Sequence, residues 1–581
     1  MSLINRVPFY CRTLRYLRLS QVFYFIRRRI FPCAQSSRHI VGLRCRAGTM
    51  MGTCLEGRHR SESESTITFL NQSKKFAEPV DWQCKEMPKL WRYNLHYFDY
   101  LQDPGRPLDN KWRLISNWIE RNPPGTDDAW EPYTASLRIV NWVKFFLSLS
   151  SDLPSCQQTE RQGRGAQALP KAVWLESLYL QALWLERNIE YHILANHYLK
   201  NGVALFFAGV YFDGPDADRW IKKGMTILRE ELDEQFLPDG GHFERSPMYH
   251  SICLVDYLDV LNLIHHSQVA FSSDGVEHIT ERVRDGLSFL KEMSLPDNQI
   301  SLFNDSAFGI APTPDEIFSY AKQVMGYQAS VTLSGLRTST LPASGYYVCR
   351  HGNDAMIIDC GSIGPDYQPG HAHCDALSFE LAFDGRRVMV DSGVFDYEAS
   401  PERTYARSTR AHNTVVVDGE EQSEIWGVFR VARRARPIQA GIETQPDGSV
   451  LFTGVHDGYR RLPGSPMHKR TILFNGAENW TIEDLLEGRG HHRMESYVHI
   501  HPDFQVVQDQ ASFYIADDEG RSIALVESHR ASEVRIEKGW YFPEFGLKRE
   551  NTVLVFTCSG SLPLSLRYRI HKVSSTSQGN L

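Results

Sequence analysis

Residues 172–210 read AVWLESLYLQALWLERNIEYHILANHYLKNGVALFFAGV, and this stretch decides the fold of the first half of the chain. Its apolar residues recur at intervals of three and four, which is typical of helices rather than strands. The same spacing occurs in SLRIVNWVKFFLSL (136–149) and HSICLVDYLDVLNLIHHS (250–267). Loops with Gly, Pro and Asp separate the segments. The sequence therefore predicts helix after helix from about residue 89 to residue 322, in a bundle or a toroid of paired helices.

The pattern changes after residue 343. Short runs of β-branched and aromatic residues, each closed by Gly, Asn or Asp, replace the helical spacing; examples are RRVMVDSG, HNTVVVDG and NTVLVFTCSG. Such runs at regular spacing indicate antiparallel strands in a sandwich or in stacked sheets. We therefore expect a basic arm and linker over 1–84, a helical domain over 85–335 and an antiparallel β domain over 343–581.

The composition is that of an ordinary globular protein. The 581 residues are 42% hydrophobic and 23% charged, and this length predicts two to three domains with ample core. A net charge of −7 argues against a nucleic-acid-binding protein. No run of about 20 apolar residues is present, so no membrane-spanning helix is expected. Nothing in the sequence indicates the oligomeric state.

The first 55 residues, which we call the arm, contain ten arginines and no acidic residue. The longest apolar run in RYLRLSQVFYFIRRRIF (15–31) is VFYFI, which is too short for the core of a signal peptide. We therefore expect a bacterial cytoplasmic or envelope-associated protein, with the periplasm as the alternative. Two interpretations of the arm stand: contact with an anionic membrane surface, or an extension that is poorly ordered or wraps a domain.

Polar residues that suit chemistry gather in GHAHCDALSFEL (370–381). In a strand, His371, His373 and Asp375 would share one face with Leu377 and Phe379. Polar groups on a face that turns toward the core are costly unless they have partners. The stretch therefore indicates a site rather than plain core.

His373, Asp391 and His412 form the first candidate set, because each lies in or beside a predicted strand. Two imidazoles and a carboxylate make a complete set of protein ligands for zinc. The alternative is three separate hydrogen-bonded residues at strand ends. Three polar groups in otherwise apolar strands favour a divalent metal, with zinc as the expected ion.

The helical half supplies the second set. Asn196 and His197 fall in the middle of an apolar helical segment, where they need partners; Asn196 either binds a ligand carboxylate or caps a loop. In LPDGGHFERSPMYHS (237–251), Ser246 and Pro247 are typical of an N-cap and a first helical residue. Tyr249 then lies in the first turn, where the helix dipole would stabilise its phenolate, or it is a half-buried anchor.

Three further residues, Arg407, Glu244 and His250, are candidates for substrate binding. Arg407, close to Tyr405 in ERTYARSTRAHNTV (402–415), either pairs with an anionic substrate or is solvated. Glu244 and His250, on either side of the predicted helix start, are candidate substrate-binding residues.

The combined set consists of Asn, His, Tyr and Arg rather than two carboxylates. A glycoside hydrolase normally needs two carboxylates, for which Asp239 and Glu244 are the available pair. Neutral donors with His and Tyr suit β-elimination on a uronic acid instead, since the carboxylate must be neutralised, a base removes the C5 proton and an acid protonates the leaving oxygen. A non-catalytic polysaccharide-binding or assembly protein is the third possibility.

Five motifs in order, NHYLKNG, GGHFERSPMYH, GHAHCDALSFEL, VMVDSG and YARSTRAHNTVVVDG, make the chain similar to the heparinase II/III-like polysaccharide lyases, which include alginate lyases. The resemblance covers the chain from about residue 85 onward. It implies an α/α toroid followed by antiparallel sheets, with the active-site cleft between them. It also implies an acidic polysaccharide as substrate.

The resemblance implies a role for each matching residue. Asn196, with His197 beside it, would neutralise the carboxylate, Tyr249 would be the acid or both acid and base, and His371 would be the base or its helper. Tyr405 would be a second tyrosine, on a segment that is short compared with some members. The metal would be structural, held by the candidate set named above. His371 would then face the cleft, and Asp375 would hydrogen-bond a ligand histidine.

LWRYNLHYFDYLQD (90–103) also resembles a subgroup of bacterial capsule and exopolysaccharide assembly proteins. Together with the lack of a recognisable signal peptide, this favours the turnover of a self-made acidic polysaccharide.

Overall fold

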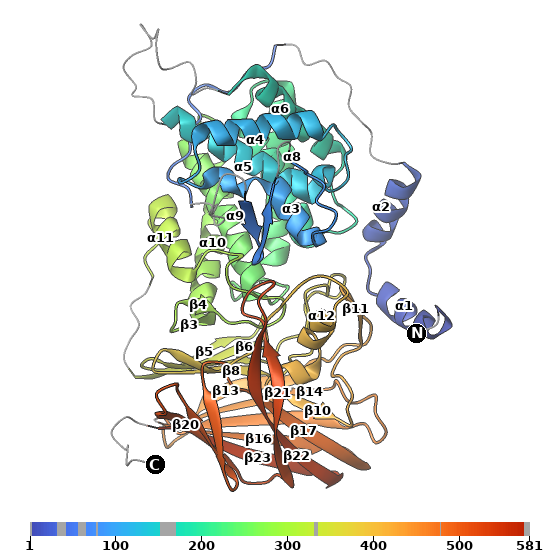
Figure 1. Ribbon diagram of the computed structural model, residues 1–581, viewed down its shortest axis with the longest axis vertical. Helices are drawn as coiled ribbons and strands as arrows, with labels where there is room; N and C mark the ends of the chain where they lie inside the picture. Colours follow the sequence, from blue (N-terminus) through green and yellow to red (C-terminus); the bar gives the residue numbers. More distant parts are fainter. Residues whose placement is uncertain are drawn as a thin grey trace.

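The computed structural model describes residues 3–31, 42–55, 66–76, 80–151, 170–329, 335–476 and 478–573. Within these residues a helical half lies above a half built of sheets (Figure 1). Helices followed by antiparallel sheets were predicted, and this order is confirmed. No helix in the described ranges combines the length and the apolarity needed to cross a membrane.

Nine helices make up the upper half in the described residues. They are α3 (Lys89–Tyr97), α4 (Leu108–Arg121), α5 (Pro132–Ser151), α6 (Ala172–Arg187), α7 (Ala195–Tyr211), α8 (Pro215–Gln235), α9 (Pro247–His266), α10 (Ser273–Met293) and α11 (Pro314–Met325). Helices α7 and α8 pack closely at Gly224, where a Cβ would lie only 2.7 Å from the backbone nitrogen of Phe206. Glycine at this position therefore permits the close approach. The interior is aromatic, and the side chains of Trp91, Trp118 and Trp142 are fully buried.

Three antiparallel sheets make up the lower half. The first contains β5 (Leu336–Leu341), β6 (Tyr346–His351), β7 (Asp354–Asp359), β8 (Phe379–Phe383) and β9 (Arg386–Met389). The second has the order β13 (Pro437–Thr444), β14 (Val450–His456), β15 (Met467–Phe474), β16 (Asn479–Glu487), β23 (Leu564–Lys572), β20 (Ser522–Ser528), β19 (Ser512–Ala516) and β18 (Gln505–Asp509). The third has the order β10 (Val415–Val417), β17 (His491–His499), β22 (Arg549–Ser561) and β21 (Glu533–Tyr541).

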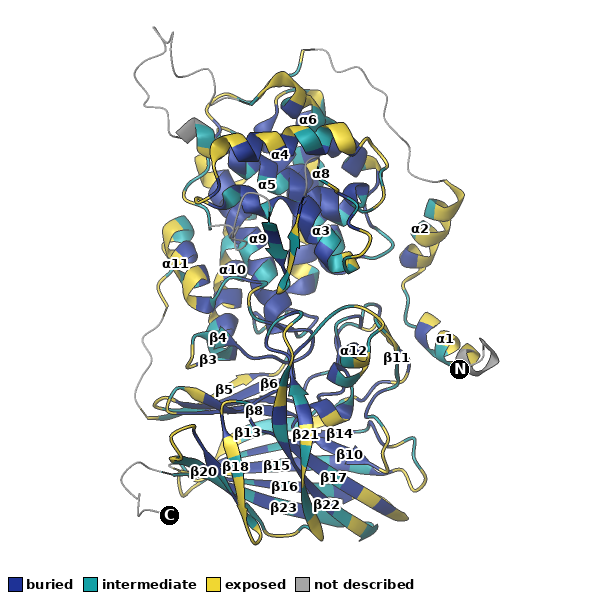
Figure 2. Ribbon diagram, in the orientation of Figure 1, coloured by how far each residue is buried: buried dark blue, intermediate teal, exposed yellow. Residues whose placement is uncertain are grey.

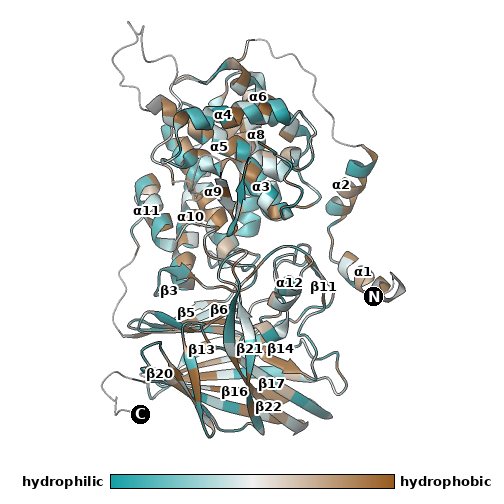
Figure 3. Ribbon diagram, in the orientation of Figure 1, coloured by the Kyte–Doolittle hydropathy of each residue, from teal (hydrophilic) through white to brown (hydrophobic). Residues whose placement is uncertain are grey.

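The five-stranded sheet is the middle layer of the molecule. Alternate residues of β6, such as Tyr347, face the core of the sandwich, whereas Tyr346 and Val348 face a cluster that includes Phe289 of α10. Strands β7 and β8 are buried along their whole length because both faces are covered. Figure 2 shows comparable burial along α9 in the helical half. Strand β16 alternates between buried and half-buried positions. Figure 3 shows both hydrophobic and hydrophilic residues among the strands of the lower half. The middle sheet therefore joins the two halves through apolar contact.

Short elements complete the fold. They are the hairpins β1 (Thr66–Phe69) with β2 (Gln72–Lys75), β3 (Ser294–Leu295) with β4 (Gln299–Ile300), and β11 (Ile425–Gly427) with β12 (Arg430–Val431), and the helix α12 (Pro401–Ala406).

The arm contributes α1 (Leu3–Leu14) and α2 (Leu19–Ile30), which run along one side of the molecule (Figure 1). Arg12 of α1 forms an ion pair of 3.0 Å with Glu424, next to the β11–β12 hairpin. On α2, the ring of Tyr24 stacks on Tyr191 of the helical half, with centroids 4.7 Å apart. The arm therefore touches both halves, as expected for an extension that wraps a domain.

Candidate functional site

A cavity of about 1170 Å³ lies where the helical half, the loops above the middle sheet and the arm meet. Helices α5, α7 and α9 supply one wall, for example through Tyr133, Asn196 and Tyr249. The loop with His371 and the segment with Tyr397 also line it. This position matches the cleft that the resemblance implies.

His371 lies in a loop and not in a strand. Strand β8 begins only at Phe379, and Leu377 has a positive φ of 64°, so the alternation of a strand does not hold over 370–378, as the separate roles expected for His371 and His373 require. The Nδ1 atom of His371 lies 2.8 Å from a carboxylate oxygen of Asp305. Its Nε2 lies 3.7 Å from Glu244. The loop therefore frees His371 and His373 from a shared strand face.

Two tyrosines meet beside His371. The hydroxyl groups of Tyr249 and Tyr397 lie 3.1 Å apart, and the ring of Tyr249 lies 4.1 Å from the imidazole of His371. Ser246 is the N-cap and Pro247 the first residue of α9, as predicted. Burial raises the pKa of Tyr249 well above its usual value, so the expected stabilisation of a phenolate at the helix start is wrong. Desolvation outweighs the helix dipole, and the resting phenol keeps its proton.

Asn196 and His197 face the same cavity from α7. They were expected in mid-helix, but α7 begins at Ala195, after Leu194 and Ala195 with φ values of 66° and 52°. Both residues therefore lie in the first turn, where the helix N-terminus favours negative charge. The Nδ1 atom of His197 lies 3.1 Å from Glu190, which orients the ring.

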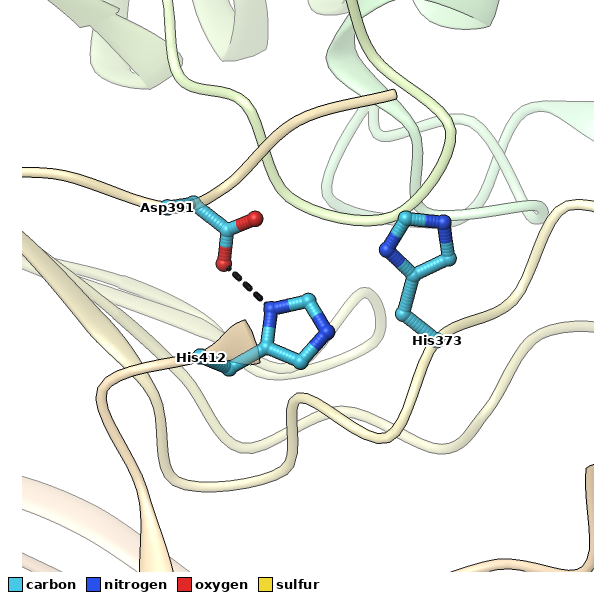
Figure 4. Close-up of side chains that lie close together, drawn as sticks. All are labelled: His373, Asp391 and His412. Carbon is cyan, nitrogen blue, oxygen red and sulfur yellow. Dashed lines mark hydrogen bonds and ion pairs between the residues drawn. The ribbon is translucent and has the colours of Figure 1, made fainter. Parts of the chain in front are cut away.

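His373, Asp391 and His412 converge below the cavity, and one ligand atom from each lies within 4.8 Å of the others (Figure 4). Nδ1 of His412 lies 2.7 Å from Asp391, and Nε2 of His373 lies 2.8 Å from Asp305. The second nitrogen of each imidazole is buried without a hydrogen-bond partner in the described part of the chain. Burial lowers the pKa of His373 to about 4, which keeps the neutral, ligating form. This donor set fits a divalent cation.

Asp305 connects the two clusters, and nothing in the sequence singled it out. Its carboxylate accepts hydrogen bonds from His371, His373 and both terminal nitrogens of Arg403. Arg403 is 2% exposed and holds the pKa of Asp305 well below its usual range, against the opposing effect of burial. Asp305 lies in the loop after β4, far in sequence from every motif, so only the fold brings it here. Arg403 stands beside Tyr405 in the stretch 402–415, but its residue type alone does not predict this role.

Two predicted site residues of the β domain lie outside the cavity wall. The guanidinium of Arg407 donates to the backbone carbonyls of Ala372, Gly427 and Val428, so it shapes the loop instead of meeting a substrate. The hydroxyl of Tyr405 accepts a hydrogen bond of 3.2 Å from the Trp540 amide. Both differ from the expected roles, and the tyrosine that lies beside Tyr249 is Tyr397.

Other predicted residues are buried in the supporting structure. His250 bonds the Gly286 carbonyl at 2.9 Å, on a side of α9 that does not line the cavity. Glu244 is 2% exposed, and its carboxylate lies 3.7 Å from Nε2 of His371. Asp375 accepts a hydrogen bond from the Asn304 amide. Asp239 accepts a hydrogen bond of 2.8 Å from the Ser344 amide, and neither Asp239 nor Glu244 lines the cavity.

Two family models match the chain in sequence order. Heparinase II/III N-terminus matches residues 59–323, and Heparinase II/III-like, C-terminal matches residues 335–576. Together they span most of the chain, in the same order as the two halves of the fold. The chain belongs to the heparinase II/III-like family.

Similar proteins agree with this assignment. The heparin-sulfate lyase of Pedobacter heparinus is 27% identical over 64% of this chain and 55% of its own length. The FtsZ-localized protein C of Caulobacter vibrioides is 21% identical, over 66% and 63%. The chain thus spans about half the length of the curated lyases it matches. A crystal structure of heparinase III superimposes with a TM-score of 0.68 at 19% identity, over 87% of this chain and 81% of that one. This likeness shows the fold, an α toroid followed by a β-sandwich.

Proposed function

We propose that the protein is a polysaccharide lyase that cleaves a uronic-acid-containing polymer by β-elimination. The observation that carries the proposal is the contact of Tyr249 with both Tyr397 and His371, in the same cavity that Asn196 and His197 line. Proton-transfer groups and neutral donors within one cavity are what this reaction requires.

The first task is to bind the substrate carboxylate. The amide of Asn196 and the ring of His197 stand at the start of α7, whose free backbone amides add partial positive charge. Hydrogen bonds to the carboxylate draw electron density from C5 and make its proton more acidic. Asn196 and His197 thus stabilise the enolate-like charge that develops during proton removal.

The second task is proton transfer. Asp305 accepts the Nδ1 proton of His371, which leaves Nε2 as the basic nitrogen. Nε2 takes the C5 proton, the electron pair forms the C4–C5 double bond, and the C4–O bond breaks. Tyr249, whose pKa burial holds high, gives its proton to the leaving glycosidic oxygen. Tyr397 lies within hydrogen-bond distance to return a proton to Tyr249.

We also propose a structural divalent cation, zinc by the chemistry of the donors, at His373, Asp391 and His412. Such an ion would tie three loops of the β domain together beneath His371. The proposed reaction requires no step at this ion.

A self-made capsule or exopolysaccharide is the proposed source of the polymer. The similarity of residues 90–103 to assembly proteins supports it, and a cytoplasmic or envelope location is proposed on the same ground.

The test is the ultraviolet absorbance of a 4,5-unsaturated product on a panel of uronate polymers. Tyr249→Phe is expected to lower turnover about 10²–10⁴-fold, since it removes the acid. Tyr405→Phe is the matched control, because this tyrosine lies outside the cavity wall, and it should keep turnover within about threefold of the parent. New reducing ends without absorbance would replace the lyase with a hydrolase.

A further inference from the structure

We infer that the cavity selects a uronate polymer without sulfate groups over a sulfated one. The inference rests on the proposed lyase function and specifies its substrate class. It follows from the charge balance and the aromatic character of the cavity wall, not from the residues that carry the reaction.

The inner wall holds two lysines, and a carboxylate already neutralises each of them. Lys200 of α7 lies 2.6 Å from Asp256 of α9, with side chains 12% and 9% exposed. Lys144 of α5 forms the same kind of pair with Asp259 of α9. Both pairs link neighbouring helices of the toroid and are nearly closed to solvent. Neither lysine is available to a ligand without leaving a buried carboxylate unpaired, which is costly.

Two outer cations are also paired. Arg434 lies 2.6 Å from Asp366. Lys89 lies 3.1 Å from Glu131, in an exposed pair whose carboxylate stands outside the wall. In the described part of the wall the cationic side chains, histidines aside, are Lys89, Lys144, Lys200, Arg430 and Arg434, and the carboxylates are Asp99, Asp256, Asp259, Asp366 and Glu398. Among the described residues the exposed Arg430 forms no ion pair, but cations and carboxylates are equal in number, so the wall carries no net positive charge.

A sulfated polymer would be poorly matched to such a wall. Sulfate groups stay ionised, and each one brought into the cavity needs a cation or several donors to replace its water. Next to a paired carboxylate it meets repulsion instead, and like charges brought together at an interface cost several kcal/mol. An unsulfated uronate brings only one carboxylate into the cavity. Asn196, His197 and the start of α7 can supply the hydrogen-bond donors that this group needs.

The remaining wall is rich in aromatic rings, which suit neutral sugar surfaces. It includes Tyr93, Tyr97, Tyr133, Tyr367, Trp426, Phe429 and Phe545. Such rings offer flat apolar faces to the C–H faces of pyranoses, and the tyrosine hydroxyls offer hydrogen bonds to sugar hydroxyls. Binding by stacking and neutral hydrogen bonds does not require a high charge density on the polymer.

The test compares polymers that share a backbone and differ in sulfation. Heparosan with heparan sulfate and chondroitin with chondroitin sulfate form two such pairs, and alginate is a further unsulfated polymer. Affinity is measured with the full-length Tyr249→Phe variant, so that cleavage does not consume the ligand. We expect at least one unsulfated polymer to bind, about tenfold or more tighter than its sulfated partner in physiological salt. Tighter binding of the sulfated member, or no binding of any unsulfated polymer, overturns the inference.

A second test removes the carboxylate partner of a wall cation in the Tyr249→Phe variant and again measures the affinity for sulfated polymers. Asp256→Asn leaves Lys200 without its carboxylate, and Asp366→Asn leaves Arg434 without its own. Either folded variant should bind a sulfated polymer several-fold tighter, with affinity that falls more steeply with salt. Asp503→Asn, at an exposed pair with Arg549, is the matched control and should change nothing. Unchanged binding of sulfated polymers in both wall variants contradicts the inference.

The two proposals fail in different ways. Selective binding of unsulfated polymers without an unsaturated product removes the lyase and leaves the selectivity in place. An unsaturated product formed faster from the sulfated member of a pair keeps the lyase and overturns the selectivity.

Discussion

Asp305→Asn is the substitution for which the structure gives the sharpest expectation. Asp305 is fully buried and faces Arg403, His371 and His373 at once. Asparagine keeps the shape and one acceptor oxygen but removes the charge and turns an NH₂ group toward two of these donors. Arg403, 2% exposed, is then left with a buried charge and no counterion.

The magnitude follows from that loss. Removing one partner of a buried ion pair costs about 3–5 kcal/mol of unfolding free energy. An exposed pair costs about 0–1 kcal/mol, so Asp503→Asn is again the matched control, with side chains 56% and 40% exposed in its pair with Arg549. Turnover should also fall by about 10–100-fold, because His371 and His373 lose the group that orients both rings.

Urea unfolding of parent and variants, followed by tryptophan fluorescence, measures the first effect, and the absorbance assay measures the second. If the urea unfolding curves are broad or biphasic, the first transitions of parent and variant are compared, since the two halves of the fold need not unfold together. If Asp305→Asn unfolds within 1 kcal/mol of the parent and keeps its turnover, the assignment of Asp305 as the link between the two clusters is refuted.

Three further predictions follow from the described residues. Purified protein should contain about one divalent ion per chain by elemental analysis, and His373→Ala should lower the unfolding temperature more than it alters turnover; an unchanged melting curve with lost activity would contradict this. The exposed residues Leu19, Phe23 and Ile30, with Arg27 and Arg29 on the same helix, are expected to bind vesicles of anionic but not of neutral lipid, and Phe23→Ser should weaken co-sedimentation. Burial lowers the pKa of His250 and of His499 to about 4, so the folded state binds their protons only at a lower pH than the unfolded state does. The stability that these two residues contribute above about pH 6.5 is therefore lost as the pH falls toward 4, and at pH 5 each residue lowers the unfolding free energy by about 2 kcal/mol. An unfolding midpoint that is unchanged between pH 7 and pH 5 would exclude this effect.

The spacing of apolar residues predicted most of the fold, because helices and strands bury residues at different intervals. The apolar pattern over 172–210 and the N-cap at Ser246 both lead directly to elements of the structure. Local spacing failed where tertiary contact decides the conformation. The run 370–381 alternates like a strand, yet the loop there bends so that two histidines reach Asp305, which follows an unrelated hairpin.

Residue type also misled where burial decides the role. Arg407 and Tyr405 stand in the motif beside His412 and carry the expected chemistry, but both are occupied by backbone groups. Tyr397, in a stretch without a motif, has its hydroxyl 3.1 Å from that of Tyr249. The sequence alone does not show which of Tyr397 and Tyr405 lies beside Tyr249, because the short helix α12 carries Tyr405 away from the cavity.

The shared carboxylate explains why His371 and His373 alternate in the sequence. One carboxylate oxygen of Asp305 accepts a hydrogen bond from Nδ1 of His371, whose ring contacts Tyr249 in the cavity. The other oxygen lies 2.8 Å from Nε2 of His373, which belongs to the same cluster as Asp391 and His412. Because Arg403 keeps Asp305 ionised, both imidazoles are held by one fixed charge. A shift of the lower cluster is therefore expected to reach the ring that faces the cavity, so emptying the proposed metal site should lower turnover, but to a smaller extent than it lowers stability, as expected for His373→Ala.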